Sequence, residues 1–338
     1  MQVRDLSVQE YESILTRISD NPPIEQLPVW QDYESAISDR SFWGYCSIEG
    51  PSIQAVCAFM DYKTHGYHFL RSHHGPVWSH TPNSSEEQEG LEALASYVRK
   101  RDKHQVFIRL CVYHELSLCQ PVLSNIPYDA TVIVDLQGGD EQILSRMKSR
   151  GRRDVRKALR ECNCTFADET DQALESFDEY YAVMSQTATR DGFVSAPEEN
   201  YTKMLHFLGP ERCRLYVARS KEDGEVVCWE MDTISGTRAV RYYAATLSGK
   251  MRNHVADALV YYAFCELGRR GCLDMDLMAI GSDFSPSLKG LNEFKCKFTK
   301  EITSVAPDRD LPLRPVLYKT LKEAKSLKKA VRSSPGTD

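Results

Sequence analysis

The sequence predicts an α/β protein made of two units, and its composition and periodicity support that prediction. The chain has 338 residues, 42% of them hydrophobic and 27% charged, which is enough for a sizeable core in each of two domains. Segments with helical periodicity alternate with short strand-like runs on both sides of the Gly138-Gly139 pair. No uncharged apolar run reaches the roughly 18 residues of a transmembrane helix, and the N-terminus lacks the apolar stretch of a signal peptide. We therefore expect a cytoplasmic protein that does not insert stably into a membrane.

The block before Gly138 is expected to contain helices at both ends of a group of strands. One helix spans about residues 7–19, because Asn21-Pro22-Pro23 closes it. Another spans about residues 86–101 and is capped by Ser84 or Ser85, with acidic residues in its first turn. The strand-like runs are residues 53–60, 67–70, 105–110 and 130–136.

The block after Gly139 begins with a helical stretch over residues 140–160 that we expect to break near Gly151. Pro307, Pro312 and Pro315 are expected to mark a linker before the last helix. The other expected elements are helices at 170–188, 198–208, 253–269, 287–297 and 316–331, and strands at 213–219, 225–233, 238–246, 273–277 and 301–305.

Missing motifs exclude several kinds of chemistry. The chain has no Walker A loop, no G-x-G-x-x-G after a strand, no G-x-S-x-G elbow and no H-E-x-x-H helix. Its 11 cysteines are scattered without a C-x-x-C pair, which is typical of a reduced intracellular protein with buried thiols. The histidines within residues 65–80 lack the spacing of a structural metal site, so we expect no metal. The net charge of −6 argues against indiscriminate binding of polyanions.

A basic run over residues 147–160 contrasts with this acidic composition. Half of its residues are Lys or Arg, so it is either a solvated helix face or a phosphate-facing ridge for RNA, a nucleotide or a cofactor. The C-terminal helix is a second basic candidate, although terminal helices are often rich in lysine for solubility alone. Its basic residues are Lys319, Lys322, Lys325, Lys328, Lys329 and Arg332.

The segment over residues 288–298 is a third candidate for a site. Phe294 and Phe298 lie four residues apart and would share a helix face, which core packing explains. Lys295 differs, because a lysine beside a buried phenylalanine can project into a site as a point-charge donor.

Three segments taken together resemble one known family. They are SRMKSRGRRDVRKALRECNCTF, RCRLYVARS…VVCWEMDT…RYYAAT and ALVYYAFCELGRRGCLDMDLMAIG…LKGLNEFKCKF. In this order they resemble the Fem family of aminoacyl-tRNA-dependent transferases, which build the interpeptide bridge of bacterial peptidoglycan. The resemblance covers residues 130–305 well and the first 130 residues weakly. Its most specific part is the closing Phe-Lys segment at its distance from Asp276.

The resemblance implies two tandem GNAT-like acetyltransferase domains with mixed sheets flanked by helices. The first would comprise residues 1–139 and be completed by the C-terminal helix at 309–338, and the second would comprise residues 140–308. The resemblance also implies a reaction without a cofactor. An amine on the stem peptide of a nucleotide-linked or lipid-linked muropeptide would attack the ester of an aminoacyl-tRNA and form an amide.

The resemblance also implies roles for individual residues. Lys295 would stabilise the developing oxyanion, with Phe294 shaping the site. Arg214 would bind the carrier diphosphate. Tyr243 would contact substrate, although a half-buried strand tyrosine explains it equally well. The tRNA backbone would face the basic ridge formed by Lys148, Arg150, Arg152, Arg153, Arg156 and Lys157.

The first block departs from the family pattern in two places. The family uses a lysine shortly after a tryptophan to hold the carrier diphosphate, whereas Trp30 is followed by Gln31-Asp32-Tyr33. Trp30 remains a substrate-binding candidate, and the lysine contact is absent or replaced. Arg109-Leu110 is followed by Cys111 where family members can carry an aspartate, so no general base is expected there.

Three other functions stay open. An acyl-CoA-dependent N-acyltransferase would share the fold, but residues 250–256 lack the glycine that lets a backbone approach a pyrophosphate closely. A tRNA-dependent amide ligase acting on a small peptide in secondary metabolism would keep the donor and change the acceptor. An RNA-binding module without catalysis would use only the basic ridge.

Overall fold

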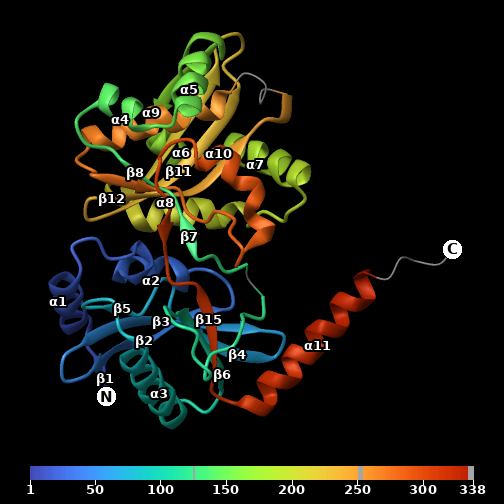
Figure 1. Cartoon of the computed structure of the whole chain (residues 1–338). Coiled ribbons are helices and arrows are strands. Elements are labelled where there is room, and N and C mark those ends of the chain that lie inside the picture. Colours follow the sequence, from blue (N-terminus) through green and yellow to red (C-terminus); the bar gives the residue numbers. More distant parts are fainter. Residues whose placement is uncertain (125, 250–253, 334–338) are drawn as a thin grey trace. The chain divides into compact units, whose positions relative to one another are not determined.

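The chain divides into two compact units, each with its own sheet. The computed structural model describes residues 1–124, 126–249 and 254–333, with side chains as far as Ser326. One unit is Met1–Pro127 with Ala306–Asp338, and the other is Tyr128–Val305 (Figure 1). Residues 128–139 therefore lie in the second unit, whereas the expected division fell after residue 139.

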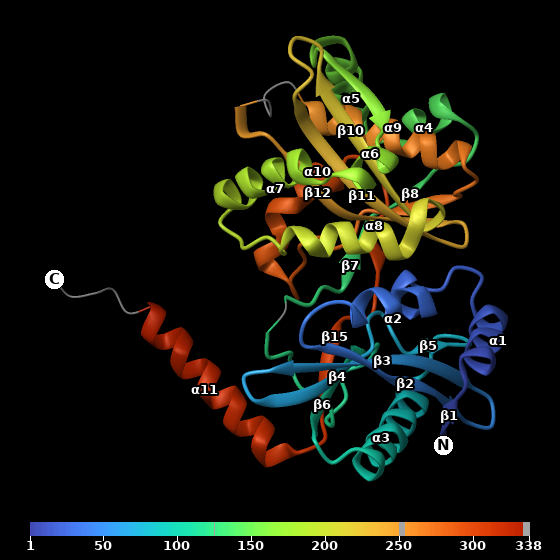
Figure 2. The same ribbon diagram turned by 180° about the vertical axis from the view of Figure 1, so that it is seen from behind.

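The first unit is a mixed sheet with the strand order β1-β2-β3-β4-β6-β15, and the short β5 pairs with β3. Neighbouring strands along this order are antiparallel except β4 and β6, which are parallel and joined by helix α3. Helices α1 and α2 pack on one face of the sheet and α3 packs on the other (Figure 2). The bounds are β1 Gln2–Leu6, α1 Val8–Ile18, α2 Pro28–Ser35, β2 Arg40–Glu49, β3 Gln54–Thr64, β4 Tyr67–Arg71, β5 Val77–Trp78, α3 Ser84–Arg101, β6 Gln105–Cys111, β15 Asp308–Pro312 and α11 Pro315–Ser333.

The elements expected at 7–19, 53–60, 67–70, 86–101 and 105–110 are confirmed as α1, β3, β4, α3 and β6. The N-cap of α3 is Asn83, however, and the prediction of Ser84 or Ser85 was wrong. The Asn83 Oδ1 accepts hydrogen bonds from the backbone N–H groups of Ser85 and Glu86 at 3.0 Å each, and Ser84 is already helical. The sequence analysis missed β1, β2 and α2.

The proline-marked segment near residue 310 is a strand rather than the linker that the sequence analysis expected. β15 pairs with β6, and Asp310 forms a buried ion pair with Arg109 through two contacts of 2.7 and 3.0 Å. Pro312 is tolerated because it is the last residue of an edge strand, and Pro315 begins α11, where its missing N–H costs nothing.

The second unit is a mixed sheet with the strand order β8-β13-β12-β11-β10-β9. Here the parallel pair is β12 and β13, joined by helix α9. α9 packs on β9, β10 and β11, and α7 and α8 pack on strands of the same sheet. The bounds are β7 Ala130–Thr131, β8 Ile133–Asp135, α4 Asp140–Arg146, α5 Ser149–Glu161, β9 Cys164–Asp168, α6 Thr170–Glu175, α7 Asp178–Asp191, α8 Glu198–Arg212, β10 Cys213–Ser220, β11 Val226–Ser235, β12 Arg238–Thr246, α9 Val255–Arg269, β13 Asp274–Asp276, a 3-10 helix Pro286–Leu291, α10 Asn292–Lys295 and β14 Thr303–Ser304.

Four expected elements of this unit are divided differently, and one of them is the helix expected at 287–297, which is a 3-10 helix over Pro286–Leu291 followed by α10. The helical stretch 140–160 breaks at Met147-Lys148 and not at Gly151, which lies inside α5. A Cβ at Gly151 would lie 2.3 Å from the carbonyl oxygen of Lys297, so this glycine permits close packing rather than ending the helix. The stretch 170–188 consists of α6 and α7, and the run 130–136 is divided between β7 and β8, which belong to different sheets.

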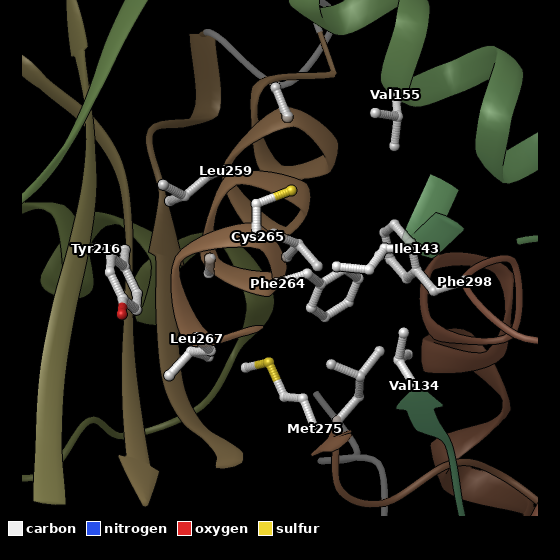
Figure 3. Packing of buried hydrophobic residues seen from close by; sticks show 14 of the residues in the cluster. Val134, Ile143, Val155, Tyr216, Leu259, Phe264, Cys265, Leu267, Met275 and Phe298 are labelled. Atoms are coloured by element: carbon white, nitrogen blue, oxygen red, sulfur yellow. The ribbon is translucent and has the colours of Figure 1, made fainter. Parts of the chain in front are cut away.

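The two sheets have the same order of strand directions, which the sequence did not reveal as a repeat. Each has four antiparallel strands, then a strand parallel to the fourth, then an antiparallel edge strand. In the core of the second unit, Leu259 and Phe264 of α9 lie among residues from several other elements (Figure 3). Phe298 contacts Phe264 edge to face at 5.5 Å, so the segment after α10 is anchored in this core.

Candidate active site

The candidate site lies where the two parallel strands of the second unit stop pairing. β12 and β13 pair only from Arg238 to Val240 and from Asp274 to Asp276, after which β12 continues to Thr246 and β13 ends. In α/β sheets, the carboxyl ends of parallel strands are where ligands most often bind. The segment that follows β13 and the short helix α10 provide the polar groups at this point.

A tight turn after β13 holds the main-chain carbonyl groups of Met278 and Ala279 in place. Asp276 Oδ1 accepts hydrogen bonds from the backbone N–H of Met278 at 2.7 Å and from the Thr131 hydroxyl, and Met278 adopts a left-handed conformation with φ of 60°. The Asn292 side chain then binds Gly281 on both sides: its Oδ1 accepts from the Gly281 N–H at 2.7 Å, and its Nδ2 donates to the Gly281 carbonyl at 2.8 Å. The turn and α10 are thereby held together.

Lys295 is the last residue of α10, and its ammonium group points at this turn. The Nζ donates hydrogen bonds to the carbonyl oxygens of Met278 at 3.2 Å and Ala279 at 2.9 Å. Within the described part of the chain, Lys295 forms no ion pair with a carboxylate. Burial, followed by the positive charge of Arg241, lowers the pKa of Lys295 to about 8. At neutral pH the group is therefore a largely protonated cation without a paired anion, and one of its three hydrogens is left for a ligand.

Phe294 is half-buried and links Lys295 to the core. Its ring contacts Phe298 edge to face at 5.3 Å and has the Arg241 guanidinium carbon 5.4 Å from its centroid. Phe298 is fully buried, so the expectation that core packing explains this pair is confirmed for Phe298. Phe294 belongs to the core and to the site at once, because its ring packs against the core and also faces the cation of Arg241.

Lys297 lies two residues after Lys295 but has a structural environment. Its ammonium forms ion pairs with Asp257 on α9 and, at 3.8 Å, with Asp154 on α5. Lys297 and both carboxylates are buried, so this contact joins three segments of the unit. The sequence analysis did not distinguish a role for Lys297, because its two partners are distant in the sequence.

Arg241 on β12 is a residue of this site that the sequence analysis missed. Its Nε donates to the Glu230 carboxylate of the neighbouring strand at 2.6 Å, and Glu230 is fully buried. Asp232 is also fully buried and lies directly opposite Arg241 in the strand register. Burial raises the pKa of Asp232 well above its usual range, and Glu230 adds to the shift. The signal available in the sequence was the pair of acids at alternate positions of the apolar run VVCWEMDT.

The other candidates of the second unit occupy different positions. Arg214 on β10 pairs with Asp168 at 3.3 Å, and Arg270 binds the same carboxylate at 3.1 Å. Arg214 is also opposite Asp232 in the register, so it lies on the sheet face that carries Arg241. Tyr243 lies on the opposite face, where its ring contacts Tyr201 of α8 at 4.8 Å.

Trp30 belongs to the first unit and lies in α2. Its side chain is 2% exposed and contacts Tyr33 edge to face at 5.0 Å. This burial does not favour a substrate contact, which stays a prediction. Arg109, two residues before the Cys111 position where no general base is expected, is equally buried and pairs with Asp310, so it has a structural role.

The basic ridge lies on and just before α5 and is partly neutralised. Arg150 pairs with Glu293 at 2.5 Å, Arg153 with Asp154 at 3.2 Å and Lys157 with Glu161 at 3.9 Å. Arg156 is exposed and has no partner among the described residues. Lys148 and Arg152 are half-buried, and Arg152 donates to the Ser145 carbonyl at 3.3 Å. Residues 250–253, part of the segment used above against an acyl-CoA site, lie outside the described residues.

The comparisons with known proteins concern the fold of the chain. Residues 145–295 match the family model of the acetyltransferase (GNAT) domain, a stretch that begins before the basic ridge and ends at Lys295. The match and the two sheets thus give this chain a GNAT-like fold, as the sequence analysis expected. No curated protein sequence matches the chain.

Solved structures resemble the chain over most of its length. The structure of FemX resembles this chain with a TM-score of 0.72 at 15% identity, covering 95% of this chain and 100% of FemX. A tandem GNAT protein from the clavulanic acid biosynthesis pathway resembles it with a TM-score of 0.55 at 10% identity over 92% of this chain and 98% of that one. L-PGS from Bacillus licheniformis resembles it with a TM-score of 0.50 at 14% identity over 88% and 91%. The chain therefore has the tandem GNAT-like fold of FemX.

Helices that could span a bilayer are absent from the part of the chain that the structure describes, since none is both long and apolar enough.

Proposed function

We propose that the protein transfers an aminoacyl group from aminoacyl-tRNA to an amine of a peptidoglycan-precursor stem peptide and so forms an interpeptide bridge. The observation that carries this proposal is the Lys295 ammonium, which two main-chain carbonyls hold at the carboxyl end of β13. Because no described carboxylate pairs with it, the cation is free to stabilise a negative charge that appears only during the reaction.

The proposed reaction is the aminolysis of an ester. The acceptor amine nitrogen forms a bond to the ester carbonyl carbon, and the carbonyl oxygen becomes an oxyanion that accepts a hydrogen bond from Lys295. The bond to the ribose oxygen then breaks, and the proton lost by the amine goes to the departing ribose hydroxyl. Lys295 stays protonated throughout, and Phe294 shapes the site beside it.

The donor and the acceptor would use different surfaces of the chain. The tRNA backbone would face the ridge of α5, where Arg156 has no competing anion among the described residues. For the acceptor, Arg214 would bind the diphosphate of a nucleotide-linked or lipid-linked muropeptide, and that anion would compete with Asp168 for it. Tyr243 and Trp30 complete the proposed substrate contacts.

The test is a transfer assay with a mixture of charged tRNAs and a lysine-containing muropeptide, read by mass. Lys295→Ala should lower the rate by about 10²–10³-fold, which corresponds to the loss of one oxyanion donor, about 3 kcal/mol. Lys300→Ala is the matched control, because Lys300 is an exposed lysine of the same segment. Near-normal transfer by Lys295→Ala would contradict the assigned role, and the absence of any product with the unmodified protein would contradict the proposed function.

The pH dependence of the rate gives a second test of Lys295. Only the protonated form brings a positive charge to the oxyanion, so a group with a pKa of about 8 should produce a fall in rate as the pH rises above that value. Lys295→Arg replaces it with a cation that does not titrate in this range. We expect residual activity without this alkaline fall, measured from pH 6 to 9.5.

An acyl-CoA-dependent N-acyltransferase is the second candidate, because the matched family model is that of the acetyltransferase (GNAT) domain. Calorimetry with acetyl-CoA separates the two functions. Micromolar affinity together with acetyl transfer would favour the second candidate, whereas transfer from charged tRNA alone would favour the first. A tRNA-dependent ligase of small peptides would be recognised in the same assay by product formation with short peptides but not with a muropeptide.

A further inference from the structure

The Arg241 guanidinium has an unusual set of contacts for an arginine that is only 12% exposed. One nitrogen, Nε, donates to Glu230 at 2.6 Å. Among the described residues, neither of the two terminal nitrogens, Nη1 and Nη2, has a hydrogen-bond partner. An arginine fork with its terminal nitrogens unused is a ready donor pair for a carboxylate or a phosphate.

The surroundings of Arg241 hold this group in place and leave its charge partly uncompensated. The buried Glu230 carboxylate fixes the Nε side, and the Phe294 ring lies 5.4 Å from the guanidinium carbon. The neighbouring cation, Lys295, has no described anionic partner. The two cations therefore have one direct ion pair between them, with Glu230. Asp276 near Lys295 and the buried Asp232 opposite Arg241 act on them without a direct contact, and burial favours the uncharged form of Asp232. The unused donors of both cations attract an anion.

We propose that Arg241 forms an anion subsite that binds a phosphate of the acyl donor, next to the ester on which Lys295 acts. This inference rests on the proposed function and names the part of the donor that the site recognises. In a 3′-aminoacylated nucleotide, the 5′-phosphate of the same nucleotide is the anion closest to the ester. In an acyl-CoA, the long pantetheine arm separates the thioester from the phosphates. Arg241 lies over the Phe294 ring and its charge acts on the neighbouring Lys295, so the two cations are near each other, which fits the nucleotide ester.

The β12 strand offers a matched control. Arg238 also donates through Nε to a carboxylate, Asp274 at 2.6 Å, but its Nη2 binds the same carboxylate at 2.8 Å. Arg238 thus uses Nε and the terminal nitrogen Nη2 to bind Asp274. Arg241 uses only Nε, and among the described residues both of its terminal nitrogens are unused. Removing Arg238 changes the charge of the same strand without removing the proposed subsite.

The experiment compares probes that differ by one phosphate. Binding is measured by calorimetry with adenosine 5′-monophosphate and with adenosine, and transfer is measured with 3′-aminoacyl-adenosine with and without its 5′-phosphate. We expect the phosphate to improve binding and kcat/KM by about tenfold or more in the unmodified protein. Arg241→Ala should reduce this advantage to less than about twofold, and Arg238→Ala should keep it. Arg241→Lys retains the charge without the fork and should retain only part of the advantage.

The outcomes separate this inference from the proposed function. The inference is overturned if the unmodified protein gains nothing from the phosphate, or if Arg241→Ala weakens both probes of a pair equally, which indicates a structural role. If no tRNA-derived ester reacts but the monophosphate binds in an Arg241-dependent way, the proposed function fails and the phosphate subsite stands. Thermal unfolding of each variant checks its fold, and Arg241→Lys carries the comparison if Arg241→Ala does not fold.

Discussion

The two units present different charges at equivalent ends of their parallel strands. In the first unit, this end follows β4 and β6, and its arginines have carboxylate partners: Arg71 with Asp308 at 3.1 Å and Arg109 with Asp310 at 2.7 Å. In the second unit, the equivalent end follows β13, and its lysine, Lys295, is held by carbonyl oxygens alone. One strand arrangement therefore supports a cluster of ion pairs in one unit and a cation without a described ion pair in the other.

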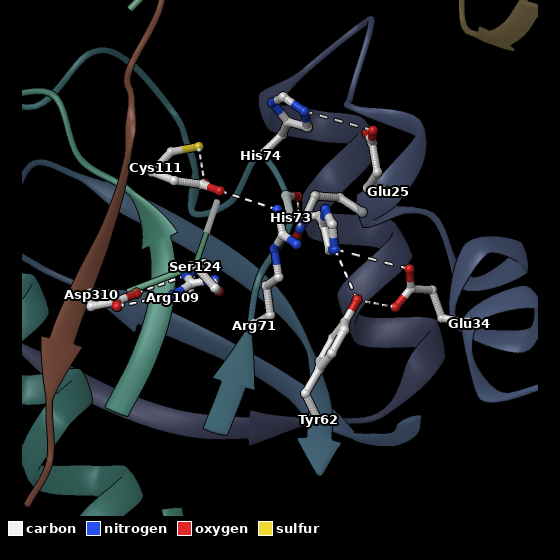
Figure 4. Close-up of polar contacts among 12 residues, drawn as sticks. Glu25, Glu34, Tyr62, Arg71, His73, His74, Arg109, Cys111, Ser124 and Asp310 are labelled. Carbon is white, nitrogen blue, oxygen red and sulfur yellow. Dashed lines mark hydrogen bonds and ion pairs between the residues drawn. The ribbon is translucent and has the colours of Figure 1, made fainter. Parts of the chain in front are cut away.

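The cluster of the first unit extends to the neutral imidazole of His73 (Figure 4). Tyr62 donates to the Glu34 carboxylate at 2.5 Å and lies 3.0 Å from the His73 Nε2. Glu34 also pairs with Arg40 at 2.9 Å. Burial, reinforced by the charge of Arg71, lowers the pKa of His73 well below its usual range. The arginines of this cluster already form ion pairs with carboxylates. We therefore place the stabilisation of an oxyanion and the binding of a phosphate in the second unit.

The largest expected effect comes from breaking a matched pair in the first unit. Asp310→Ala leaves the Arg109 guanidinium buried without its anion, so we expect a loss of about 3–5 kcal/mol in the free energy of unfolding of this unit. Urea unfolding followed by tryptophan fluorescence measures it, because three of the four tryptophans lie in this unit. Asp308→Ala is the control, since its ion pair with Arg71 is partly exposed and should cost less. Equal losses for Asp310→Ala and Asp308→Ala would contradict the claim that the buried Arg109–Asp310 pair is the more important of the two for stability.

A second prediction is that two lysines of one segment have different roles, one mainly in stability and the other mainly in activity. Lys297→Met removes the partner of two buried carboxylates and should cost about 3–5 kcal/mol in the unfolding free energy of the second unit. Lys295→Met removes only hydrogen bonds to carbonyls and should cost about 1 kcal/mol. In the transfer assay the order should reverse, with Lys295→Met the less active of the two at a temperature where both are folded. The same order in both assays would remove the distinction between a structural and a functional lysine.

Local signals in the sequence were sufficient for most elements, and they made Lys295 a candidate whose role stays a prediction. Apolar runs located β3, β6, β10 and β11, because most of their side chains are buried in contiguous stretches. Similar runs located β4 and β12, although most residues of these two strands are only half-buried. The Phe-Lys segment made Lys295 a candidate because the lysine directly follows a phenylalanine, and the family resemblance then suggested its role. In both cases the information lies within a few neighbouring residues.

Features that depend on distant partners could not be predicted in this way. Gly151 resembles a helix breaker until the Lys297 carbonyl is placed against it. Pro312 resembles a linker residue until its strand is paired with β6, about 200 residues earlier in the chain. Arg241 could not be recognised as a site residue from the sequence, because its position beside Glu230 and Asp232 depends on the strand register. Sequence spacing carries none of these contacts.

A third prediction concerns the buried acid beside Arg241. Asp232 has a raised pKa and no hydrogen-bond partner for either carboxylate oxygen among the described residues. Above the unfolded value of about 3.9, the unfolded chain releases this proton while the folded chain keeps it, so stability falls as the pH rises. An asparagine side chain does not titrate, so Asp232→Asn should gain stability relative to the unmodified protein by up to about 1.4 kcal/mol per pH unit while Asp232 stays protonated. Urea midpoints from pH 5 to 8 measure this, and parallel curves would show that Asp232 is ionised in the folded state.

The smallest expected effect tests whether the uncompensated charge of the second unit extends to α5. Arg156 has no described anionic partner, whereas Arg153 pairs with Asp154 at 3.2 Å. If the ridge binds tRNA phosphates, Arg156→Gln should weaken binding about equally for all tRNAs and reduce the slope of log K against log salt concentration by about 0.7–0.9, the value for one released counterion. Arg153→Gln should reduce the slope less, because its charge is already partly neutralised. Filter binding of uncharged tRNA between 50 and 200 mM salt gives both slopes, and an unchanged slope for Arg156→Gln would make this ridge a solvated helix face.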